Sequence, residues 1–122
     1  RSTRALVRTA NVLAETAAGD PSTVVIAGAH LDTVKCTAGA NDNASGAAAL
    51  LETALQMARV PPRNKVRFAF WAGEEDGLKG STTYVDRLSG SELARIAVYL
   101  NFDMIASPNH VFGVFTGTPR RS

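Results

Sequence analysis

The chain has almost no cysteine and no long hydrophobic run. Cys36 is its only cysteine, so no disulfide can form within the chain, and we expect this residue to be a small buried filler rather than a metal ligand. No stretch is long enough to span a membrane, and no signal peptide is recognisable in the strand-like first residues. Low-complexity tracts typical of disorder are also missing. With 122 residues, of which 45% are hydrophobic, the chain is one domain or part of one.

Neither sign of charge dominates the sequence. Lys and Arg number 13 against 11 Asp and Glu, and the basic residues are scattered. Arg63, Lys65 and Arg67 alternate along a predicted strand, as on a solvated or edge face, so we do not expect nucleic-acid binding. Carboxylates that converge in a fold raise one another's pKa values, and a bound divalent metal relieves their repulsion. Five acids are candidates for such a cluster: Asp32, Asp42, Glu74, Glu75 and Asp103.

Strand-like and helix-like patterns alternate along the chain. Residues 4–16 and 23–29 are predicted strands, and the turn signal between them predicts an antiparallel hairpin. Asn43 or Ser45 is expected to cap the first helix, and Ser91 a short turn. The other predicted elements are helices at 46–59 and 78–88, strands at 65–71, 97–102 and 111–115, and the short turn at 91–95. This alternation predicts a layered α/β sheet.

Each candidate functional group follows a predicted strand. His30 and Asp32 follow the second strand, the pair at 74–75 follows the third, and Asp103 follows the fourth. Ligands of open α/β sheets collect beyond the carboxyl ends of the strands, so we expect these side chains to meet. Histidine and carboxylates without a thiolate cluster suit zinc, manganese or cobalt at a catalytic site.

The residue types also indicate roles at this site. His30 offers nitrogen, while Asp42, Glu75 and Asp103 offer oxygen. Asp32 could accept the spare imidazole N–H and fix the tautomer of His30. Two adjacent glutamates can have different roles: one can bind metal while the other holds the attacking water.

Each of these residues also has an ordinary structural explanation. A histidine after a strand can be a satisfied loop residue, and Asp42 can be an Asx-turn residue. The acids at 74–76 can form a solvated turn, and Asp103 can cap a helix. Their joint placement after strands favours the metal site. Among the neighbours, Trp71 is expected in the core and His110 on a surface loop, whereas Met104 could line a specificity pocket or the core.

Three segments, GAHLDTV…NDNASG, FAFWAGEEDGLKGS and YLNFDMIASPN, resemble the co-catalytic zinc aminopeptidases, the family of aminopeptidase Y and the bacterial leucyl aminopeptidases. The resemblance runs from about residue 11 to about residue 115. It implies a three-layer α/β/α domain of the zinc exopeptidase type with a mixed, mostly parallel sheet. Residues 1–122 would form a single domain whose C-terminal part is missing.

The resemblance also implies the chemistry. Two zinc ions would activate a water that hydrolyses the N-terminal residue of peptides with a free amino terminus. The peptide bond between Asp42 and Asn43 would be cis, and many relatives have Asp where this chain has Asn43. The roles implied are zinc binding by His30 and Asp103, bridging of both ions by Asp42, binding of the second zinc by Glu75, general-base catalysis by Glu74, orientation of His30 by Asp32, and, as a weaker suggestion, substrate contact by Met104.

The family's further histidine ligand lies beyond the last residue of this chain. We therefore expect the second zinc site to be incomplete and the chain alone to be weakly active or inactive. Family members are mostly exported, which implies a secreted or cell-envelope location.

Three alternatives differ in chemistry. Zinc carboxypeptidases and acyl-amino-acid deacylases share His-x-Asp-Thr-Val, but their bridging aspartate lies much further along the chain. Glutaminyl cyclase-like acyltransferases share the fold but use one metal. A non-catalytic homologue would use the fold as an interaction domain, since fold alone does not determine function.

Overall fold

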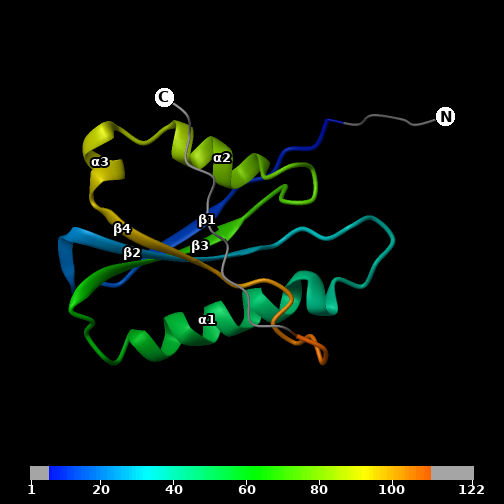
Figure 1. Ribbon diagram of the computed structural model, residues 1–122, viewed down its shortest axis with the longest axis horizontal. Coiled ribbons are helices and arrows are strands. Elements are labelled where there is room, and N and C mark those ends of the chain that lie inside the picture. Colours follow the sequence, from blue (N-terminus) through cyan, green and yellow to red (C-terminus); the bar gives the residue numbers. More distant parts are fainter. Residues whose placement is uncertain (1–5, 111–122) are drawn as a thin grey trace.

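A four-stranded mixed sheet forms the centre of the molecule in the computed structural model, which describes residues 6–110 (Figure 1). The central strand β2 pairs in parallel with β3 on one side and with β4 on the other, while β1 runs antiparallel to β3. The strands, in the spatial order β1-β3-β2-β4, are β1 Val12–Glu15, β3 Asn64–Trp71, β2 Asp20–His30 and β4 Ile96–Asn101. The predicted mixed, mostly parallel sheet is confirmed.

Helices cover both faces of this sheet. Helix α1 (Gly46–Met57) lies along one face, and α2 (Lys79–Asp86) and α3 (Gly90–Ala94) lie over the other, which gives the predicted three-layer α/β/α arrangement (Figure 1). An irregular helical turn, η1 (Ala40–Ser45), leads into α1. Among the described residues, no helix has the length and apolar character needed to cross a membrane.

The core consists of two apolar clusters, one on each face of the sheet. Successive residues of β2 alternate between them, because side chains along a strand point to opposite faces. This explains why the sequence of β2 is a continuous β-branched run. The cluster on the α1 side contains Ala27, Ala29, Leu50, Val66 and Phe68. The opposite cluster contains Val24, Ile26, Ala69 and Trp71, with Tyr84 of α2 packed against it.

The predicted hairpin between the first two strands is wrong. Strand β1 pairs with β3, in the register Val12 with Phe70 and Glu15 with Arg67, and β2 has β3 and β4 as its neighbours. The turn signal showed correctly that the chain reverses, but pairing depends on which strand edge is free. Because β3 occupies that side of β2, the half-exposed β1 becomes an edge strand.

Three smaller expectations also require correction. Helix α3 is capped by Ser89 and not by Ser91: the Ser89 hydroxyl accepts a hydrogen bond from the Glu92 N–H at 3.2 Å in a capping box. Cys36 is exposed rather than buried. Strand β3 lies inside the sheet, and its Arg67 forms an ion pair with Glu15 instead of lying on a free edge.

Other local expectations can be compared directly with the structure. Trp71 is buried and His110 is exposed, as predicted. The predicted strand at 111–115 lies outside the described residues.

Candidate metal centre

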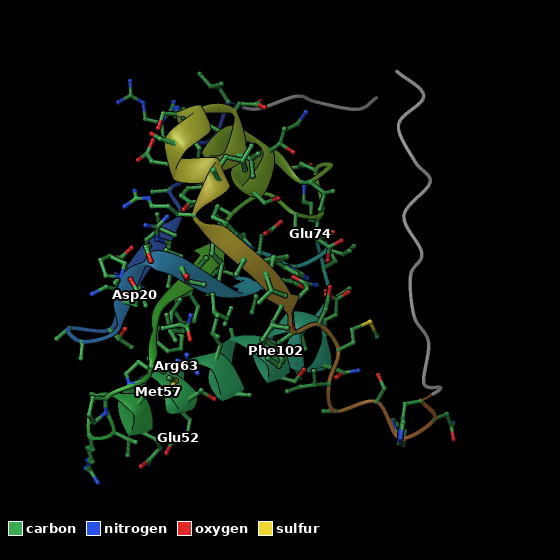
Figure 2. All side chains as sticks on the ribbon, turned by 60° about the vertical axis from the view of Figure 1, so that its left-hand side comes forward. Asp20, Glu52, Met57, Arg63, Glu74 and Phe102 are labelled. Atoms are coloured by element: carbon green, nitrogen blue, oxygen red, sulfur yellow. The ribbon has the colours of Figure 1, made fainter. Side chains whose placement is uncertain are left out.

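The parallel strands bring the candidate residues to one edge of the sheet. His30 is the last residue of β2 and lies opposite Trp71, the last residue of β3, so the segment that follows Trp71 starts beside the imidazole. Residue Gly28 of β2 lies opposite Asn101, the last residue of β4. In Figure 2, Glu74 and Phe102 lie toward this end of the molecule, and Asp20 and Arg63 lie toward the other.

His30 is at the centre of the cluster. Its side chain is only 3% exposed, and its Nε2 atom lies 3.0 Å from Asp42 Oδ1, 3.5 Å from Asp103 Oδ1 and 4.0 Å from Glu74 Oε2. Two groups of side chains could each hold a metal ion, since their ligand atoms lie within 4.8 Å of one another. They are His30 with Asp42 and Asp103, and His30 with Glu74 and Glu75.

The tautomer of His30 follows from its second nitrogen. Nδ1 lies 2.9 Å from the backbone carbonyl oxygen of Asp32. A carbonyl can only accept, so Nδ1 carries the hydrogen and the lone pair of Nε2 faces the carboxylates. Burial alone would lower the pKa of His30, but this hydrogen bond and the charges of Asp103, Glu74 and Asp42 together raise it.

Asp32 connects the ends of β2 and β3. Its two carboxylate oxygens accept hydrogen bonds from the backbone N–H groups of Glu74 and Glu75, at 3.0 and 3.1 Å. Burial would raise the pKa of Asp32, but these hydrogen bonds outweigh it and the pKa is lowered. The carboxylate lies 3.8 Å from His30 Nδ1, so the close contact that orients His30 comes from the backbone carbonyl of Asp32.

The two glutamates lie in different surroundings. Burial raises the pKa of Glu74, and the charges of Glu75, Asp103 and Asp32 raise it further, against the opposing effect of His30. A raised pKa suits a group that accepts a proton near neutral pH. Glu75 Oε1 instead accepts a hydrogen bond from the backbone N–H of Val34, at 3.1 Å.

The segment around Asp42 is fixed by its neighbours. The Asp42–Asn43 peptide bond is cis, as the family resemblance implied. Asn43 Oδ1 accepts a hydrogen bond from the Gly46 N–H at 3.0 Å, so Asn43 and not Ser45 supplies the side-chain cap of α1. Thr33 Oγ1 donates to the Asp42 carbonyl at 3.1 Å.

The sequence did not predict the contacts that Thr33 and Val34 make with the candidate metal ligands, and it left the placement of Met104 open. Thr33 and Val34 lie between His30 and Asp42 with nothing in the sequence to distinguish them, and their contacts exist only in the folded chain. Met104 follows Asp103 and is 46% exposed, so it does not belong to the core.

The donor set fits a divalent cation. It consists of one imidazole nitrogen and several carboxylates, and this mixture suits zinc in a catalytic site. Within the described part of the chain, no lysine or arginine forms a salt bridge with these acids, and the imidazole of His30 is the basic group that lies among them. The arrangement could therefore hold metal at the carboxyl edge of the sheet, with Glu74 beside it as a proton acceptor.

The sequence and the fold of this chain are similar to those of known proteins. The family model of peptidase family M28 matches residues 11–122. An aminopeptidase of Pseudomonas aeruginosa (strain UCBPP-PA14) is 55% identical over 112 residues, which cover 92% of this chain and 20% of that protein. Leupeptin-inactivating enzyme 1 of Streptomyces exfoliatus is 50% identical over 111 residues, which cover 89% of this chain and 25% of that protein.

A solved structure has the same fold. The zinc aminopeptidase of Bacillus subtilis superposes with a TM-score of 0.72 at 39% sequence identity, over 78% of this chain and 24% of that one. The chain thus spans about a fifth to a quarter of the length of these relatives.

Proposed function

The chain belongs to peptidase family M28, and on that premise we propose that it carries the metal-binding part of an aminopeptidase. The reaction proposed is hydrolysis of the peptide bond after the N-terminal residue of a peptide. The observation that carries the proposal is the position of His30 Nε2, which lies within 4.0 Å of carboxylate oxygens from Asp42, Asp103 and Glu74. The names of similar proteins support the same reaction class.

Zinc is the metal proposed, because the donor set suits it and the similar Bacillus subtilis protein is a zinc enzyme. His30, Asp42 and Asp103 would hold one ion, with Asp42 also reaching a second ion held by Glu75. Bound zinc supplies Lewis-acid activation of a water and of the scissile carbonyl. The second ion needs a ligand in addition to Asp42 and Glu75, so we propose that a residue outside the described range 6–110 completes its site.

The chain's own residues handle the proton and the orientation of the ligands. Glu74 accepts a proton from the attacking water and returns it to the amine nitrogen of the leaving peptide. Its raised pKa supports this role, because a carboxylate with an ordinary pKa is a weaker base. Asp32 holds the backbone of Glu74 and Glu75, and its carbonyl fixes the tautomer of His30.

The test uses the natural full-length protein with aminoacyl p-nitroanilides and with the same compounds N-acetylated. If the protein hydrolyses the free-amine substrates and leaves the N-acetylated ones intact, the result supports an aminopeptidase. Cleavage of N-acyl amino acids or of C-terminal residues would instead favour a deacylase or carboxypeptidase. No hydrolysis of any substrate by the zinc-loaded protein would favour a non-catalytic homologue and overturn the proposal.

Glutamate variants separate the base from the ligand. Glu74→Gln should lower kcat by about 10²–10⁴-fold, the usual contribution of a general base, while zinc stays bound. Glu75→Gln should reduce the amount of zinc bound per chain, measured by elemental analysis. Glu52→Gln is the matched control, since Glu52 lies on α1 away from the cluster (Figure 2). Loss of zinc in Glu74→Gln with retention in Glu75→Gln would reverse the two assignments.

A further inference from the structure

The side chain of Asn43 contacts both residues that flank Asp103. Its Nδ2 donates to the Phe102 carbonyl oxygen at 2.9 Å, and its Oδ1 accepts from the Met104 N–H at 3.4 Å. The same Oδ1 atom accepts from the Gly46 N–H at 3.0 Å. One carboxamide, directly after Asp42 in the chain, therefore joins the start of α1 to the backbone on either side of Asp103.

This contact requires an amide. The Phe102 carbonyl can only accept, and the N–H groups of Gly46 and Met104 can only donate, so the side chain must offer a donor on one branch and an acceptor on the other. Asn43 is 3% exposed, so water has little access to replace a lost partner. A buried polar group without its partner is costly, so removing the carboxamide from this chain should leave the partners of Asn43 unsatisfied.

Gly46 allows the close approach. A Cβ atom at this position would collide with the Phe102 carbonyl oxygen and with Asn43 Oδ1. Glycine here therefore lets the start of α1 pack directly against the segment that carries Asp103. Figure 2 shows Phe102 where the end of β4 meets α1.

We propose that Asn43 is a positioning residue that sets the placement of Asp103 relative to Asp42 and thereby organises the metal site. Asp103 lies just beyond the end of β4, and its side chain is 35% exposed. The backbone of the preceding residue is held to β2 by one hydrogen bond, from the Phe102 N–H to the Gly28 carbonyl at 2.9 Å. Asn43 adds ties immediately before and after Asp103. The role rests on the proposed metal-dependent function.

Asn41 offers a matched control two residues away. Its Nδ2 donates to Ser107 Oγ at 3.0 Å, and its Oδ1 accepts from the Ala106 N–H at 3.1 Å. Asn41 therefore joins the same two segments with the same type of side chain, but its contacts lie beyond Met104 and do not flank Asp103. Removing either side chain costs hydrogen bonds between these segments, and only Asn43 should affect the metal site.

The experiment compares Asn43→Ala and Asn41→Ala in the natural full-length protein. Three quantities are measured: zinc affinity by calorimetric titration of the metal-free protein, the visible absorption spectrum of the cobalt-substituted protein, and the melting temperature without metal. Partners that hold ligand residues are typically worth about 10–100-fold in metal affinity. We expect Asn43→Ala to show this loss of zinc affinity together with an altered cobalt spectrum. In Asn41→Ala, the zinc affinity and the cobalt spectrum should stay close to those of the wild type. Both variants should melt at lower temperature than the wild type.

Wild-type zinc affinity in Asn43→Ala, or an equal loss in both variants, would overturn the proposal and leave Asn43 a purely structural residue. Asn43→Leu is the second variant, because leucine fills the buried space and limits unfolding caused by a cavity. Wild-type zinc affinity in Asn43→Leu, or a loss no larger than that in Asn41→Ala, would likewise overturn the proposal. Peptidase activity is not the readout. Zinc binding without hydrolysis in the wild type would refute the proposed function alone, and normal zinc binding in the Asn43 variants would refute the positioning role alone.

Discussion

Replacing Asp32 by asparagine tests how the site is held together. Each carboxylate oxygen of Asp32 accepts one backbone N–H, from Glu74 at 3.0 Å and from Glu75 at 3.1 Å. An asparagine keeps one accepting oxygen and replaces the other with an NH₂ group, which cannot accept. One of the two N–H groups would then face a donor. The backbone carbonyl that contacts His30 is unchanged by the substitution.

The cost in stability can be estimated from these contacts. A hydrogen bond to a charged group contributes about 1.5–3 kcal/mol, and the Asp32 side chain is 29% exposed, so water replaces part of the loss. We expect Asp32→Asn to lower the free energy of unfolding of the metal-free protein by about 1–2 kcal/mol at pH 7. Urea unfolding followed by circular dichroism measures the difference. Asp20→Asn is the control, because both hydrogen bonds that Asp20 accepts, from the N–H and the hydroxyl of Ser22, go to one oxygen.

The pH dependence gives an independent test of the same contact. The pKa of Asp32 in the folded protein is lowered from its ordinary value of 3.8. A lowered pKa means that the ionised carboxylate stabilises the fold above the unfolded pKa, and that this contribution is lost as the pH falls through the folded pKa. The stability difference between wild type and Asp32→Asn should therefore be constant from pH 7 to about pH 5 and shrink at lower pH.

The functional effect should separate two roles of Asp32. Because the His30 tautomer depends on the retained carbonyl, Asp32→Asn should reduce kcat more than zinc affinity. Equal losses in both would show that the carboxylate also holds zinc ligands in place, either Glu75 through its backbone N–H or His30. Unfolding free energies that match the wild type at pH 7, or a difference that does not change with pH, would refute the hydrogen-bond argument.

Two further predictions concern the core and the histidine. Leu50 is 2% exposed and packs in the cluster beneath the sheet, so Leu50→Ala should cost about 2–5 kcal/mol in urea unfolding, whereas Leu51→Ala, at a residue that is 53% exposed, should cost much less. The pKa of His30 is raised above 6.5, and zinc must displace its proton, so zinc affinity should already weaken as the pH falls from 8 to 6.5. Calorimetric zinc titrations across this pH range measure the affinity, and an affinity that does not change with pH would contradict the prediction.

Much of the fold follows from local patterns in the sequence. The continuous β-branched run of β2 and the periodic apolar residues of α1 identified a buried strand and an amphipathic helix, because each pattern matches the period of its element. Alternation of strands and helices then indicated a layered α/β sheet. The same logic placed His30, Glu74 and Asp103 beyond strand ends, and the parallel pairing of β2, β3 and β4 confirms the shared edge.

The sequence by itself determined most of the elements, the type of donor atoms and the edge where they meet, since these depend on side-chain chemistry and on periodicities within short segments; it did not determine the bounds of β1 or the turn η1. Only the tertiary structure decided how distant segments pair and touch. Strand β1 joined β3 rather than β2 because β2 already had two neighbours. The contacts of Asp32 with Glu74 and Glu75, and of Asn43 around Asp103, join residues at least 42 positions apart. Such contacts depend on how the strand ends and α1 pack together, which no local pattern encodes.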